Sequence, residues 1–99
     1  MEEQNNMVHF DWDDNKNKLN IKQHGLDFEF AKQIFDKDLI IVPDVRFDYK
    51  ENRYIGYGKI DGRLMVVVYT ERFPDIIRII SFRKANNREN KIYKKNRLG

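Results

Sequence analysis

The feature that most constrains the fold is the dipeptide Asp61-Gly62, which stands between two strand-like segments. Residues 53–60 (RYIGYGKI) and residues 63–71 (RLMVVVYTE) are rich in the aromatic and β-branched residues that favour strands. An Asp-Gly pair is typical of a two-residue type I′ turn, because both central positions of that turn require a positive φ. The sequence therefore predicts that the two segments pair as an antiparallel hairpin.

Further strands are predicted on either side of this hairpin. Residues 39–42 (LIIV) form a short apolar segment that ends at the turn signal Pro43-Asp44. Residues 76–83 (IIRIISFR) are almost continuously apolar, which predicts a central strand that is buried on both faces. Residues 9–14 (HFDWDD) suit either a short strand or an irregular lead-in to a helix. We therefore expect an antiparallel sheet of three or four strands.

Two helices are predicted before the sheet, and each begins at an aspartate. Asp13 or Asp14 caps a polar surface helix over residues 15–24, and Gly25 ends it, because glycine adopts a left-handed terminus without steric cost. Asp27 caps the second helix. The apolar residues of the second helix recur at helical spacing and form one stripe: Phe28, Ala31, Ile34 and Phe35.

A third helix is predicted after the last strand. Asn86 and Glu89 stand three residues apart, as in a capping box, at the start of a basic segment. The order of elements is therefore helix, helix, antiparallel strands and helix. That order is typical of a small α+β sandwich with helices on one face of the sheet. The chain has 99 residues, so we expect a single domain over residues 1–99.

Positive charge is concentrated at the C-terminal end of the chain. Residues 83–99 contain seven basic residues and one acidic residue, a net charge of +6, whereas residues 1–82 carry a net charge of −3. A concentrated cationic end favours a polyanionic partner such as RNA or DNA. The alternative interpretation is a solvated basic tail that binds no partner.

The composition excludes several classes of site. The chain has no cysteine, which removes disulfides, thiolate zinc sites and cysteine nucleophiles, and suits a reducing cytoplasm. His9 and His24 are the only histidines, and neither has a second ligand at a zinc-binding spacing. Residues 56–62 (GYGKIDG) are interpreted as a strand and hairpin and not as a phosphate-binding loop. We therefore expect no metal and no cofactor.

The sequence also predicts a cytoplasmic protein. It contains no run of about 18 apolar residues, so no segment that spans a membrane is expected. Residues 1–10 (MEEQNNMVHF) carry acids where a signal peptide has basic residues, and no apolar segment follows them.

Charged residues near the ends of the last two predicted strands are the candidates for chemistry. Antiparallel pairing around residues 72–75 (RFPD) is expected to bring Glu71 close to Arg78, and Arg83 stands at the end of the last strand. Such a cluster can cleave an RNA phosphodiester without a metal. A base takes the proton of the ribose 2′-hydroxyl, cations stabilise the pentavalent phosphorane, and an acid protonates the departing 5′-oxygen. Arginine suits the cationic role, and His24 suits either proton transfer because histidine titrates near neutral pH.

Each candidate also has a structural interpretation. Glu71 and Arg78 suit a simple cross-strand ion pair, and His24 at a helix C-terminus favours the negative end of the helix dipole. Arg78 and Arg83 have opposite parity along one strand. They share a face only if a β-bulge intervenes or if Arg83 already lies beyond the strand.

Three segments resemble the BrnT family of bacterial toxins: residues 10–28 (FDWDDNKNKLNIKQHGLDF), 61–72 (DGRLMVVVYTER) and 77–93 (IRIISFRKANNRENKIY). The resemblance implies a RelE-like fold and the ribonuclease half of a type II toxin–antitoxin pair, which cleaves mRNA, inhibits translation and arrests growth. It further implies a BrnA-type antitoxin as partner, and contact with promoter DNA only through that antitoxin.

The resemblance gives functional weight to residues near the helix and strand ends: Lys16, Asn20, Lys22, His24, Glu71, Arg72, Arg78, Ser81, Arg83 and Lys84. Two positions depart from the family pattern. Gln23, directly before His24, stands where the family often has lysine, so the contact that a lysine would make from this position is not expected here. Phe82 stands where a small residue is usual, which is expected to alter the packing beside Arg83.

The resulting hypothesis is a metal-independent endoribonuclease that requires no cofactor. Its expected catalytic residues are His24, Glu71, Arg78 and Arg83, and the choice between general acid and general base is left open. Its expected RNA-binding residues are Lys16, Lys22, Arg72, Ser81, Lys84 and Arg88. The alternative is a non-catalytic module that holds RNA or the antitoxin through the basic C-terminal helix.

Overall fold

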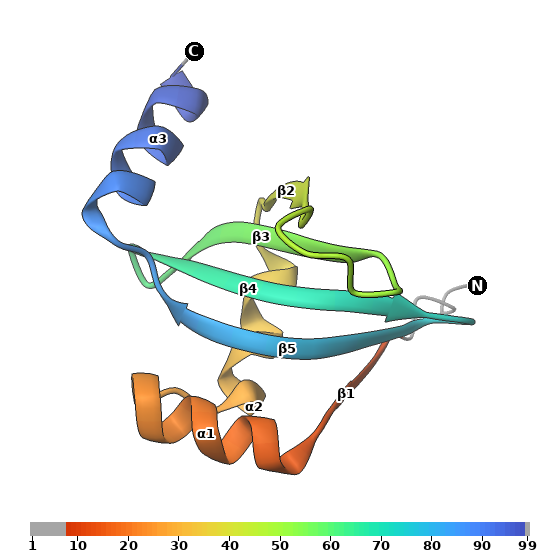
Figure 1. Cartoon of the computed structure of the whole chain (residues 1–99). Helices are drawn as coiled ribbons and strands as arrows, with labels where there is room; N and C mark the ends of the chain where they lie inside the picture. Colours follow the sequence, from red (N-terminus) through yellow and green to blue (C-terminus); the bar gives the residue numbers. More distant parts are fainter. Residues whose placement is uncertain (1–7, 99) are drawn as a thin grey trace, which may run out of the picture.

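The computed structural model describes residues 8–98, with the side chains of residues 8–96. The described part contains a five-stranded sheet with strand order β1-β5-β4-β3-β2, together with helices on both of its sides (Figure 1). The strands are β1 (His9–Trp12), β2 (Ile40–Pro43), β3 (Arg53–Ile60), β4 (Arg63–Arg72) and β5 (Ile76–Lys84). The helices are α1 (Asp14–His24), α2 (Phe28–Ala31), the 3₁₀ helix η2 (Lys32–Asp36) and α3 (Asn87–Leu98). Residues 1–7 lie outside this range. They are part of the segment 1–10, for which the sequence predicts that no signal peptide is present.

The hairpin predicted from Asp61-Gly62 is confirmed. Asp61 has a φ of 50° and Gly62 a φ of 79°, and Ile60 pairs with Arg63 on either side of the turn. Both turn residues therefore have the positive φ that a type I′ turn requires. This turn fixes the register of β3 against β4 over the full length of β3.

The predicted sheet of three or four antiparallel strands is wrong in two respects. Residues 9–12 form a fifth strand, β1, and this strand runs parallel to β5, with Phe10 opposite Ile77 and Trp12 opposite Ile79. A parallel pair needs a crossover connection, and the long stretch of chain between β1 and β5 supplies it. The alternation of apolar Phe10 and Trp12 with polar neighbours is the strand signal that the sequence carried.

The prediction that residues 76–83 are buried on both faces is also wrong. In β5 only Ile79 and Phe82 are buried, whereas β4 is the middle strand of the sheet and is buried from Leu64 to Thr70. The reason is that the two faces of β5 differ. One packs on the helices, and the other carries Arg78, Ser81 and Arg83.

The hydrophobic core lies between one face of the sheet and the segment α2–η2. The predicted stripe supplies Phe28, Ala31 and Ile34, all fully buried, and Trp12 packs edge-on against Phe28 at 6.1 Å between ring centroids. The sheet contributes the alternate residues that share this face: Met65, Val67, Tyr69, Ile79 and Phe82. We call the opposite face, which carries Arg53, Arg78 and Arg83, the arginine face.

The predicted helix caps are confirmed. The Asp13 carboxylate accepts hydrogen bonds from the N–H groups of Asn15 and Lys16, and the Asp27 carboxylate accepts one from the N–H of Glu29. Gly25 ends α1 with a φ of 69°. These caps fix where α1 and α2 begin, so the turn between them is short and directs α2 onto the core face.

The buried side chain of Asn20 joins α1 to the outer edge of β5. The strand β1 pairs with β5 only as far as Ile79. Beyond that point, Asn20 Nδ2 donates to the carbonyls of Phe82 at 2.8 Å and Leu26 at 2.9 Å, and the N–H of Phe82 donates to Asn20 Oδ1 at 3.1 Å. The amide thus occupies the place of a pairing strand, which holds α1 beside the end of β5 (Figure 1).

Replacing Asn20 with alanine is expected to lower the free energy of unfolding by about 3 kcal/mol, because it leaves buried backbone groups of Phe82 without partners. Urea unfolding followed by circular dichroism measures the loss. Asn15→Ala is the matched control, since Asn15 lies on the same helix with an exposed side chain. Equal losses in the two variants would contradict this role of Asn20.

Candidate functional site

A β-bulge in β5 brings Arg78 and Arg83 to the same face of the sheet. Val68 of β4 pairs with Ser81, but the next residue, Tyr69, pairs with Ile79. Ile80 is therefore an extra residue in β5, and the parity of the side chains changes there. One of the two conditions under which the arginines share a face is thus met within the strand itself.

The register of the sheet arranges the arginine face in rows that run across the strands. Strands lie about 4.8 Å apart, so long side chains two strands apart reach one another across the middle strand. From β3 through β4 to β5 the rows are Tyr57–Val66–Arg83, Ile55–Val68–Ser81 and Arg53–Thr70–Arg78. The middle position of each row is buried, whereas the outer positions are polar in two rows.

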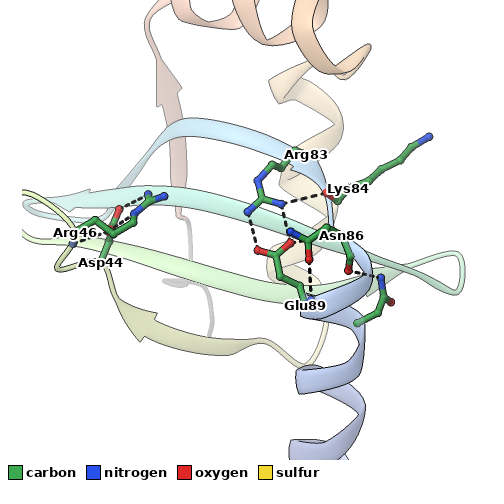
Figure 2. Close-up of polar contacts among 7 residues, drawn as sticks. Asp44, Arg46, Arg83, Lys84, Asn86 and Glu89 are labelled. Carbon is green, nitrogen blue, oxygen red and sulfur yellow. Dashed lines mark hydrogen bonds and ion pairs between the residues drawn. The ribbon is translucent and has the colours of Figure 1, made fainter.

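Arg83 is held by the carboxylate of Glu89 at the start of α3. Its Nη1 donates to Glu89 Oε1 at 2.8 Å and its Nη2 donates to Oε2 at 2.7 Å (Figure 2). This hydrogen-bonded ion pair raises the pKa of Arg83 and lowers the pKa of Glu89, against the opposing effect of burial. The guanidinium is therefore charged and fixed in orientation.

Glu89 also takes part in the predicted capping box, which is confirmed. The N–H of Asn86 donates to Glu89 Oε1 at 2.9 Å, and the N–H of Glu89 donates to Asn86 Oδ1 at 2.8 Å. One carboxylate thus starts α3 and orients Arg83. The sequence signal identified the cap, but the contact with Arg83 was missed as a feature of the site.

Arg78 has a different acidic partner from the one expected. Its Nη1 donates to Asp11 Oδ2 at 2.7 Å, because β1 lies beside β5 and places Asp11 opposite Arg78. Glu71 pairs with Ile77, so it has the parity of the core face, and Arg78 pairs with Thr70 on the arginine face. The expectation that Glu71 lies close to Arg78 is wrong. Arg78 is opposite Thr70, and Glu71 is the next residue of β4, so its side chain points to the other face of the sheet.

A third acidic residue, Glu51, holds two arginines at the other end of the arginine face. Arg53 Nε donates to Glu51 Oε2 at 2.9 Å, and Arg72 Nη2 donates to Glu51 Oε1 at 3.2 Å. The hydrogen bond from Arg53, with a smaller contribution from Arg72, lowers the pKa of Glu51. Arg72, expected to bind RNA, is therefore joined to the segment before β3.

The helix α1 presents its predicted site residues along the edge of β5. Lys16 and His24 lie one turn before and one turn after Asn20, so they project from the side of α1 that faces β5. Both side chains are exposed, as is Lys22. No hydrogen bond or ion pair among the described residues joins His24 to Arg78 or Arg83, so its role in catalysis stays a prediction.

The remaining predicted RNA-binding residues lie at the end of β5 and the start of α3. Ser81 is half-buried on the arginine face between Arg78 and Arg83, and Lys84 is exposed at the last position of the strand. Arg88 is exposed on the first turn of α3.

A further carboxylate–arginine pair on the arginine face has no counterpart among the sequence predictions. The side chain of Asp44 has no exposed surface, and Arg46 grips it with Nε at 2.8 Å and Nη2 at 2.7 Å (Figure 2). The hydroxyl of Tyr49 donates to the same carboxylate at 3.2 Å. The hydrogen bond from Arg46 is the largest cause that lowers the pKa of Asp44 to about 2. In the sequence Asp44 was interpreted only as a turn residue, although the spacing Asp-x-Arg was visible.

Tyr57 lies on the arginine face, where the charges of Arg46 and Arg83 both act on its hydroxyl. It shares a row with Arg83, and burial raises the pKa of its hydroxyl, as does Glu89, whereas Arg83 and Arg46 act in the opposite direction. Tyr57 and Glu89 also line a pocket of about 180 Å³ against α3. The charges of Arg46 and Arg83 therefore meet at one aromatic residue on this face.

The described residues were also searched for a metal site and for a membrane-spanning helix. Across residues 8–98, no three acidic or histidine side chains gather closely enough to hold a metal ion. No helix within that range is sufficiently long and apolar to cross a membrane.

Residues 12–89 match the family model described as the ribonuclease toxin BrnT of a type II toxin–antitoxin system. The matched segment contains the last residue of β1, all of β2, β3, β4 and β5, and Glu89. This chain belongs to the BrnT family. The chain is accordingly a ribonuclease toxin, which implies an RNA substrate and an antitoxin partner.

The fold is also that of a solved member of the family. The crystal structure of the Brucella abortus ribonuclease toxin BrnT matches with a TM-score of 0.61 and 24% sequence identity, over 82% of this chain and 100% of that one. At this identity the likeness shows the fold alone. A search of curated protein sequences finds no match to this chain.

The buried Asp44 is expected to make this BrnT protein's stability sensitive to acid between about pH 4 and pH 2. Its pKa is about 2 in the folded state, below the ordinary value of 3.8, so the unfolded chain takes up the proton first as the pH falls. The contribution is fully present above pH 3.8 and is lost as the pH falls through about 2.

Urea unfolding at a series of pH values measures this dependence. The unfolding free energy of the wild type should fall more steeply on acidification than that of Asp44→Asn. Asp48→Asn, which changes an exposed acid of the same loop, should keep the wild-type dependence. Parallel curves for the wild type and Asp44→Asn would contradict the assignment.

Proposed function

We propose that this BrnT toxin is a metal-independent endoribonuclease that cleaves mRNA by attack of a ribose 2′-hydroxyl on the adjacent phosphodiester. The observation that supports the proposal is the position of Arg78 and Arg83. Both lie on the arginine face because Ile80 is bulged, and Ser81 lies between them. Guanidinium groups on one face suit a phosphate that gains negative charge during the reaction.

In the proposed reaction, Arg83 and Arg78 contact the oxygens of the scissile phosphate. The 2′-oxygen loses its proton to a base and attacks phosphorus, which gives a doubly charged phosphorane. The bond to the 5′-oxygen then breaks as that oxygen receives a proton, which leaves a 2′,3′-cyclic phosphate. Glu89 and Asp11 fix the two arginines in orientation, so the fork geometry is available before RNA arrives.

His24 and Glu71 are the proposed groups for proton transfer, with Lys22 and Arg72 in support. His24 lies on the side of α1 that faces the end of β5, and its exposed imidazole is accessible to RNA that lies along this edge. Glu71 and Arg78 have opposite parity, so the proposed proton transfer by Glu71 does not use Arg78 as its ion-pair partner. Lys16, Ser81, Lys84 and Arg88 are proposed to contact the RNA backbone.

Replacing Arg83 with alanine is expected to reduce the rate of RNA cleavage by about 10² to 10³-fold, because one cation that acts on the transition state is lost. Purified protein and a long RNA with a labelled end provide the assay. Arg63→Ala removes the same charge at the turn end of β4, away from the arginine face, and should cleave at nearly the wild-type rate. Undiminished cleavage by Arg83→Ala would remove this residue from the site.

The proposed partner is a BrnA-type antitoxin, which neutralises the toxin by covering its site and carries the complex to promoter DNA. We also propose that the fold is related to that of the RelE-like toxins. The chain is proposed to form a single domain over residues 1–99 and to be located in the cytoplasm. The exposed basic residues of α3 support a role for this helix in binding an acidic partner surface: Arg88, Lys91, Lys94 and Lys95.

A second candidate function is a non-catalytic module that holds RNA or the antitoxin through α3. The basic surface of α3 favours this alternative, because phosphate contacts alone give binding without cleavage. The two functions are distinguished by the fate of a long RNA incubated with the protein in EDTA. We expect fragments whose 3′ ends carry a cyclic phosphate. A gel shift of RNA that stays intact would support the binding module instead.

A further inference from the structure

Arg46 is the strongest unassigned feature of the arginine face. It lies in the loop between β2 and β3, and neither the family resemblance nor the proposed catalytic set includes it. Its side chain is 57% exposed, whereas the side chain of Asp44, which holds it, has no exposed surface. A guanidinium that a buried carboxylate holds on one side, and that is exposed on the other, suits a residue that recognises a ligand. Its orientation is fixed, while its outer N–H groups can reach the ligand.

The donors of Arg46 are only partly used. Asp44 accepts from Nε and Nη2, and Tyr49 interacts with the same guanidinium, which leaves two of its five N–H hydrogens. Arg83 is in the same condition. Glu89 engages Nη1 and Nη2, and the carbonyl of Lys84 accepts from Nη1 at 3.3 Å, which leaves Nε and the second hydrogen of Nη2. Each arginine is thus held by a carboxylate and keeps N–H groups that no neighbour among the described residues engages.

The two arginines belong to one surface. Asp44 continues the register of β2, because its N–H donates to the carbonyl of Arg53, so it has the parity of the arginine face. In Figure 2 the Arg46 and Arg83 guanidinium groups lie on the same side of the sheet. The charge of each acts on Tyr57, which shares a row with Arg83, and the charge of Arg46 acts on Arg83 as well.

We propose that Arg46 and Arg83, each held by its own carboxylate, bind the phosphodiester backbone of single-stranded RNA together, with Arg46 contacting a phosphate that is not cleaved. This inference rests on the proposed function, since it assumes that RNA lies on the arginine face. Asp44 is then a positioning residue for Arg46, as Glu89 is for Arg83.

The other interpretation of Arg46 is that it only staples its own loop. Asp44 also accepts from the N–H of Arg46 and from the hydroxyl of Tyr49, so the cluster does hold the loop in place. A staple and a recognition residue differ in one measurable respect. Only the recognition residue affects affinity for RNA and the salt dependence of that affinity.

Binding of a 2′-O-methyl RNA oligonucleotide in EDTA tests the proposal, because this RNA lacks the nucleophile and binding is measured apart from cleavage. Arg46→Gln keeps an amide donor for Asp44, and Lys50→Gln removes a charge from the same loop whose acidic partner, Asp48, is exposed. We expect Arg46→Gln to raise Kd about tenfold and to lower the slope of log Kd against log salt by about 0.7, and Lys50→Gln to change Kd by less than about twofold. Equal effects of the two variants, or no effect of Arg46→Gln, would overturn the proposal.

A second measurement uses the unaltered protein, so it does not depend on the folding of a variant. Phenylglyoxal modifies accessible arginines, and mass spectrometry locates the sites. The oligonucleotide should protect Arg46 and Arg83 but not Arg63, which lies at the hairpin turn. Modification of Arg46 that RNA does not reduce, or that only a bound antitoxin reduces, would overturn the proposal.

The two proposals fail separately. A protein that binds the 2′-O-methyl RNA through Arg46 but leaves ordinary RNA intact would contradict the ribonuclease mechanism and leave this inference standing. A protein that cleaves RNA at the wild-type rate and affinity after the Arg46→Gln change would do the reverse.

Discussion

Ile80 has no partner in β4, and the arrangement of the arginine face depends on that one unpaired residue. In a regular strand, Arg78 and Arg83 would point to opposite faces, and one of the two cations would have to enter the core. The bulge changes the parity between them, so Ile79 and Phe82 stay in the core while both arginines face outward. The buried amide of Asn20 supports this geometry, since it pairs with Phe82 just beyond the bulge.

Each arginine of the face is gripped by an acidic side chain. Asp11 holds Arg78, Glu89 holds Arg83, and Asp44 holds Arg46, while Glu51 holds Arg53 and Arg72. Such pairs gain little stability where they are exposed, but they restrict the rotamers of long side chains and thereby fix the direction of the fork. In the proposed function, the exposed lysines of α1 and the basic residues of α3 add to the long-range attraction of RNA.

Glu89 connects two parts of the protein that the sequence presents as separate. It closes the capping box of α3, and it holds both terminal nitrogens of Arg83. The start of the basic helix and the orientation of a proposed catalytic arginine therefore depend on one carboxylate.

The sequence by itself determined the features that depend on local chemistry. The Asp61-Gly62 turn, the caps at Asp13, Asp27 and Asn86, and the helical stripe of Phe28, Ala31 and Ile34 all follow from short-range rules. The residue pattern of β5 also indicated Arg78 and Arg83 as candidate catalytic residues. Their opposite parity showed that they could share a face only with a β-bulge between them or with Arg83 beyond the strand.

Only the tertiary structure decided which charged groups meet. Arg78 meets Asp11 because β1 joins the sheet parallel to β5, and Glu71 is separated from it because the register places them on opposite faces. Arg46 joins the face because its loop folds over the buried Asp44. These contacts depend on strand order, strand direction and one bulge. Such features are set by packing between distant segments, and a single sequence carries no short-range signal for them.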